Sequence, residues 1–167
     1  MNKEQAKMDV ISWIVNFVEK PHPALNNWPP CPYARAARVK GQVDIRIGTV
    51  PDQDLAEFAK GMPEGVDVVT LIYDPVKWEL QPFRASWQQT QREVLAAVGI
   101  YVLEDHPEEV ELVNGVKMNQ GQYPLLFVQR LAKLEEAADQ LAQQGYYHDW
   151  PEEYLQSVFE HRRDPRK

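Results

Sequence analysis

Apolar residues recur every three or four positions in several parts of the chain, a spacing that predicts amphipathic helices. The first such stripe predicts a helix over residues 3–20, and a second predicts a long helix over residues 124–144. Residues 21–32 separate the first helix from the rest of the chain. They include five prolines, which favour an extended loop. Residues 151–161 predict a final helix.

Strands are predicted where the three- and four-residue spacing gives way to alternating or continuous apolar residues. Val43, Ile45 and Ile47 alternate with polar residues, as in a half-buried strand. Residues 66–73 are almost continuously apolar and rich in β-branched side chains, which predicts a central strand covered on both faces. Residues 100–103 predict another strand, and helices are expected over residues 51–60 and 83–98.

This order of elements predicts an α/β (or α+β) fold with a single mixed β-sheet and flanking helices. An Asn114-Gly115 pair within Val/Leu alternation predicts a tight hairpin that adds antiparallel pairing. No Pro/Gly/Ser-rich linker divides residues 1–167, so we expect one domain. One contiguous core is expected to hold Val68, Leu71, Trp87, Val94, Val102, Leu131 and Leu134.

Charge and composition exclude several classes of protein. The formal net charge of −7 opposes nonspecific binding to nucleic acid. No stretch approaches the roughly 20 apolar residues of a membrane span, and no secretory signal is evident. Cys31 is the only cysteine, so no internal disulfide can form. We therefore expect a cytoplasmic protein.

Cys31 is the first candidate for chemistry. Pro32 suits the first position of a helix, which would place Cys31 at the helix N-cap, where the dipole favours a thiolate. Arg35 and Arg38 would lower the thiol pKa further and could hold a carboxylate or phosphate. The alternatives are that Cys31 is a packing residue and that the arginines lie on a solvated helix face.

Asp74 and His106 are the second candidates, because each follows a predicted strand. If those strands run parallel, both side chains emerge at one edge of the sheet and could form an acid–base pair. Cys31 and His106 would then share a site. The alternative is that Asp74-Pro75 and His106-Pro107 are turn residues.

Two resemblances concern the same residues. Cys31-Pro32-Tyr33 resembles the glutaredoxin active-site motif, with Ala34 in place of the second cysteine. Residues 31–130 more widely resemble an uncharacterised bacterial family of unknown function that carries a Leu-Cys-Pro-Phe-Ala motif. Residues 123–130 resemble that family's Tyr-Pro-x-Leu-His-Leu-Leu-Arg segment, which adds Tyr123 and Arg130 as candidate binding residues.

The family's histidines are replaced here by Asp74 and Phe127, which weakens any metal site built on those positions. We expect neither a metal nor another cofactor. The leading hypothesis is a small enzyme that acts on an anionic small molecule. Cys31 would be the nucleophile, His106 the acid–base group, and Arg35 and Arg38 would orient the substrate. The alternative is a noncatalytic ligand-binding or protein-interaction module that uses residues 21–32 and the C-terminal helix.

Overall fold

A four-stranded mixed β-sheet forms the centre of the molecule in the computed structural model, which describes residues 1–167. Its strand order is β1 (Val43–Ile47), β2 (Val68–Ile72), β6 (Leu125–Arg130) and β3 (Ile100–Asp105). β1 and β2 are parallel, and β6 runs antiparallel to both β2 and β3. The sheet and its flanking helices confirm the fold class that the sequence predicts.

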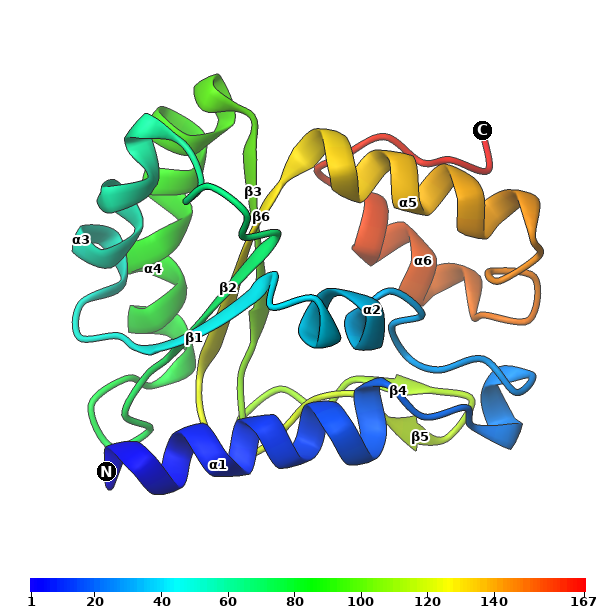
Figure 1. Cartoon of the computed structure of the whole chain (residues 1–167), viewed down its shortest axis with the longest axis horizontal. Helices are drawn as coiled ribbons and strands as arrows, with labels where there is room; N and C mark the ends of the chain where they lie inside the picture. Colours follow the sequence, from blue (N-terminus) through cyan, green and yellow to red (C-terminus); the bar gives the residue numbers. More distant parts are fainter.

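Helices α3 (Pro51–Ala56) and α4 (Leu80–Thr90) cover one face of the sheet (Figure 1). α3 continues as a 3₁₀ turn (Glu57–Lys60), and α4 continues as a π-helical turn (Gln91–Leu95) and a 3₁₀ turn (Ala96–Val98). The largest core cluster lies here. It includes Leu71, Tyr73, Phe83, Trp87 and Val102.

The other face is covered by α1 (Lys3–Trp13), α2 (Ala34–Val39), α5 (Leu131–Gln143) and α6 (Glu152–Phe159) (Figure 1). α1 continues as a π-helical turn (Ile14–Val18), and a 3₁₀ turn (Pro23–Leu25) lies in the proline-rich loop. Two smaller clusters fill this side. One packs Ala6, Val10 and Ile14 against the sheet, and the other joins α5 to α6.

The predicted single core is therefore divided between the two faces of the sheet. Leu71, Trp87, Val94 and Val102 share the large cluster, but Val68 and Leu134 lie outside it and are half-buried. Leu131 is also half-buried and outside it. Successive side chains of a strand point to opposite faces, so Val68 and Leu71 cannot share one.

The predicted long helix over residues 124–144 is wrong in its first part. Residues 125–130 form β6, and the helix begins only at Leu131. Leu125, Leu126 and Val128 are fully buried, because β6 lies between two other strands. The apolar positions there fit a helical spacing by coincidence, and the continuous apolar run is that of an inner strand.

The Asn114-Gly115 hairpin forms as predicted between β4 (Leu112–Val113) and β5 (Val116–Lys117). Asn114 and Gly115 both have positive φ angles, 51° and 79°, as a type I′ turn requires. The hairpin is nevertheless a separate two-stranded sheet. The mixed character of the main sheet comes from β6 instead.

Candidate functional site

Cys31 lies in the loop that packs against the segment after α5, and it does not cap a helix. Its backbone N–H donates to the Val18 carbonyl (3.1 Å), and the Tyr146 hydroxyl donates to the neighbouring Pro30 carbonyl (2.6 Å). α2 begins at Ala34, with Tyr33 as its N-cap residue. The expected N-cap position for Cys31 is wrong, because the chain turns once more before the helix starts.

The structure also opposes a reactive thiolate. Cys31 is exposed as a residue, but desolvation of its thiol raises the thiol pKa above its ordinary value. The backbone N–H groups of Tyr33 and Ala34 oppose the shift, and the negative charge of Glu19 adds to it. The expected depression of the pKa is therefore reversed in direction.

The two arginines near Cys31 are placed differently. Arg38 donates to both carboxylate oxygens of Glu19, at 2.6 and 3.0 Å, and only 3% of the Glu19 side chain is exposed. This bidentate pair lowers the Glu19 pKa and occupies the guanidinium fork. Arg35 is exposed and makes no ion pair. The arginines therefore do not converge on the thiol.

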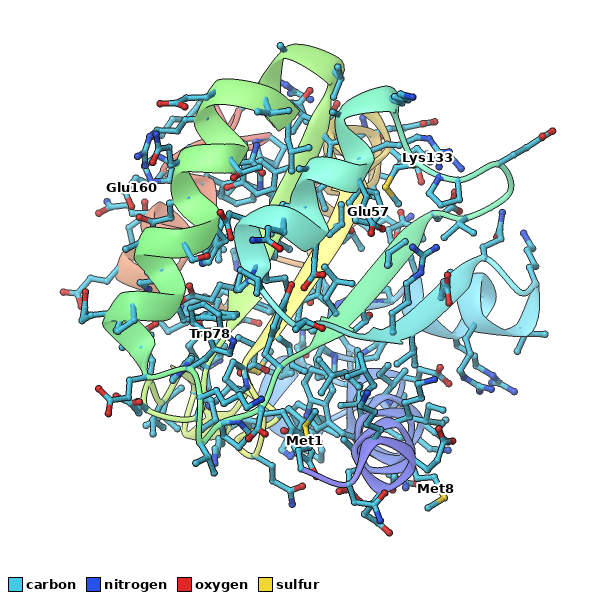
Figure 2. The ribbon with its side chains drawn as sticks, turned by 90° about the vertical axis from the view of Figure 1, so that its left-hand side faces the viewer. Met1, Met8, Glu57, Trp78, Lys133 and Glu160 are labelled. Carbon is cyan, nitrogen blue, oxygen red and sulfur yellow. The ribbon has the colours of Figure 1, made fainter.

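Asp74 and His106 do emerge at the same end of the sheet, because β2 and β3 both run antiparallel to β6. Both stabilise the turn that follows β2. The Asp74 carboxylate accepts from the Val76 N–H (3.1 Å), and its carbonyl accepts from the Trp78 N–H (3.2 Å). The Trp78 carbonyl in turn contacts His106 Nε2 (3.1 Å). Figure 2 shows Trp78 at the base of α4.

Neither ring nitrogen of His106 is free for proton transfer. Nδ1 accepts from the Glu108 N–H (3.2 Å), so Nε2 carries the proton and donates to Trp78. The residue is 3% exposed, and its ring packs against Phe83 on the α4 side of the sheet. These contacts match the interpretation of Asp74 and His106 as turn residues. Cys31 is hydrogen-bonded instead to Val18, in the segment that follows α1 and packs on the other face of the sheet, so the structure does not bring it to His106.

The crevice at the carboxyl ends of the parallel strands is filled. Tyr73 follows β2 and is fully buried, and its ring lies so close to Gly48 that a Cβ there would stand 2.4 Å from a ring carbon. Ligands of open α/β sheets usually enter at such strand ends. Here an aromatic ring occupies that space, and burial raises the pKa of its phenol.

Tyr123 and Arg130 also make internal contacts. The Tyr123 hydroxyl donates to the Asp9 carboxylate of α1 (2.7 Å). Arg130 donates to the carbonyls of Val66 (2.5 Å) and Pro63 (3.2 Å), which fixes the loop before β2. Beside Tyr123, a polar hollow of about 300 Å³ is lined by Asp9, Ser12, Trp13, Asn16, Gln120 and Gln122, with no cationic side chain.

Asp105 is the most perturbed carboxyl group, and the sequence interpretation passed over it in favour of His106. It is 7% exposed. Its Oδ2 accepts from the Gln120 N–H (2.7 Å), while Oδ1 has no partner. Burial raises its pKa to about 7, helped by the negative charge of Glu111. Its position just after the strand predicted over residues 100–103 was the available signal.

The two edges of the main sheet differ. At β3, the side-chain amide of Gln91 donates to the Ile100 carbonyl (3.0 Å) and accepts from the Val102 N–H (2.8 Å), so it closes part of that edge. At β1, the Gln42 carbonyl and the Gly48 N–H bond to β2. Backbone groups alternate in direction along a strand, so those of Val43, Ile45 and Ile47 face outward. No side chain bonds to them.

A groove of about 380 Å³ lies beside this open edge, between β1 and the α1–α2 side of the molecule. It is lined by Ile11, Ile14, Val43, Ile45 and Arg38. Its only charged residue is the arginine already paired with Glu19. In Figure 2, β1 is the outermost strand of the sheet, next to α1. The edge and the groove together form what we call the β1 surface.

Comparison with protein-family models, curated proteins and solved structures found no match for this chain. None of the helices combines the length and apolar character needed to cross a bilayer. The structure contains no group of three or more His, Cys, Asp or Glu side chains arranged to hold a metal ion.

Proposed function

We propose that this protein is a noncatalytic interaction module that binds an extended protein segment along the β1 surface. The observation that carries the proposal is the open edge of β1, where three residues turn their backbone N–H and C=O groups away from the sheet. An exposed edge is a template for another strand, and many recognition domains bind peptides in this way.

The internal contacts of the predicted site residues support this choice over an enzyme. His106 uses both ring nitrogens, Arg38 is paired, and the Cys31 thiol pKa is raised. Catalysis on an anionic substrate would need a free acid–base group near a cationic one. Neither the polar hollow nor the groove offers an unpaired cation.

The asymmetry of the two sheet edges is further support. Gln91 satisfies backbone groups at β3, whereas no side chain does so at β1. β1 also alternates apolar side chains on the α1 face with Asp44 and Arg46 on the α3 face. An added strand could therefore place apolar side chains over the groove while its backbone bonds to β1.

The test is a titration of isotopically labelled protein with synthetic seven-residue peptides of alternating β-branched and charged residues. We expect the amide signals of Val43, Ile45 and Ile47 to shift most. The matched control is the same peptide N-methylated at every second residue, which removes the hydrogen bonds of one edge. It should bind at least about tenfold more weakly. If no peptide shifts these signals, or if methylation has no effect, the proposal is wrong.

A further inference from the structure

We infer that the partner of the β1 surface is a second copy of this chain, an inference that rests on the proposed function. The two β1 strands pair antiparallel about a two-fold axis at Ile45. The two four-stranded sheets then join into one sheet of twice the width. Such a contact is self-complementary, as the interface of a symmetric dimer must be.

The backbone direction of β1 suits this pairing. Val43, Ile45 and Ile47 face outward, so Ile45 of one copy and Ile45 of the other can exchange both of their hydrogen bonds. Val43 then lies opposite the partner's Ile47, and Ile47 opposite the partner's Val43. Every outward-facing N–H and C=O group of the strand gains a partner, so no buried polar group is left unpaired.

Charge complementarity selects this register. With the axis at Ile45, Asp44 lies directly opposite the partner's Arg46, and Arg46 opposite the partner's Asp44. These are non-hydrogen-bonded positions, where side chains approach most closely. An axis at Asp44 or at Arg46 would instead place two like charges opposite each other.

Both charged side chains are available for such contacts. The Asp44 and Arg46 side chains are 39% and 38% exposed, and they pair with each other within one copy (2.7 Å). A guanidinium has five N–H donors, so Arg46 can hold its own Asp44 and the partner's together.

The apolar face favours the same occupant. Val43, Ile45 and Ile47 lie on the α1 face of β1, and the groove beside them continues to Ile11, which is 42% exposed. In the paired arrangement, the partner's three apolar β1 side chains extend the same face. Each copy therefore offers the alternation of apolar and charged residues that the other edge requires.

The test uses charge exchange at the two positions, with dimerisation measured by sedimentation over a range of concentrations. Asp44→Arg places two arginines opposite each other across the interface, and Arg46→Asp places two aspartates opposite each other. Each single variant should weaken self-association at least about tenfold. The double variant D44R/R46D restores opposite charges and should restore the dimer. An equimolar mixture of the two single variants should form a heterodimer.

The matched control is Asp139→Arg, which makes the same charge change on α5, where Asp139 forms an exposed ion pair with Arg163. It should leave self-association unchanged, and circular dichroism checks that each variant folds. If the chain stays monomeric at millimolar concentration, or if the charge exchanges at positions 44 and 46 do not change its dimerisation, the partner is not a second copy. If peptides still shift the β1 amide signals, only this inference fails; if they do not, the proposed function fails too.

Discussion

At the scale of single residues, neighbours in sequence have opposite environments. His106 has both ring nitrogens bonded, whereas the adjacent Asp105 has an unpartnered carboxylate oxygen and a pKa raised to about 7. The sequence alone favours His106 as the acid–base group, because the ordinary pKa of histidine lies near neutrality. Burial decides otherwise, and burial depends on segments further along the chain, such as that of Gln120, whose N–H binds the Asp105 carboxylate.

We predict that Asp105 makes the protein less stable as the pH rises. Its carboxyl pKa is about 7 when folded against an ordinary 3.8, so the folded state holds the proton more tightly. The stability from this group is fully present below about pH 4 and is lost as the pH rises through about 7. Asp105→Asn keeps an acceptor for the Gln120 N–H but does not titrate.

Denaturant unfolding at pH 4, 6 and 8 measures the effect. From pH 4 to pH 8, the wild type should lose about 2–4 kcal/mol relative to Asp105→Asn, at 1.36 kcal/mol per pKa unit. The control Asp139→Asn removes an exposed carboxylate whose pKa is lowered. This variant should therefore lose stability between pH 4 and pH 8 as the wild type does. Parallel pH profiles for the wild type and Asp105→Asn would contradict the prediction.

At the scale of elements, the sheet depends on a strand that the sequence pattern hides. Helical spacing and a continuous apolar run coincide over residues 125–130, and only the two flanking strands decide between them. The Asn-Gly hairpin was predictable because its backbone angles are a local requirement. The closure of the β3 edge by Gln91 was not, because it joins a π-helical turn to a strand.

We predict that Gln91→Ala opens the β3 edge. Two hydrogen bonds are lost, to the Ile100 carbonyl and from the Val102 N–H, which should cost about 1–2 kcal/mol of unfolding free energy. The exposed backbone groups should also increase aggregation, followed by light scattering. Gln89→Ala is the matched control, because Gln89 lies on the same helical segment and its side chain hydrogen-bonds only to Glu93. If the two variants have the same unfolding free energy and the same tendency to aggregate, Gln91 does not close the β3 edge.

At the scale of the whole molecule, the fold class was predictable and the candidate site was only partly so. Alternating elements predict the mixed sheet, and strand direction brings Asp74 and His106 to one end of it. Cys31 could not be placed, because a proline-rich loop has no periodicity that fixes the side of the sheet on which it packs. The open β1 edge depends on strand order, which local patterns do not encode.

The exchange of the β1 backbone amides with deuterium tests the central claim most directly. In dilute protein, the outward N–H groups of Val43, Ile45 and Ile47 should exchange at least about tenfold faster than those of Asp44 and Arg46, which face β2. Raising the protein concentration, or adding a binding peptide, should slow only the outward set. Uniform protection of all five amides in the dilute monomer would mean that the edge is already covered, and it would contradict the interaction function.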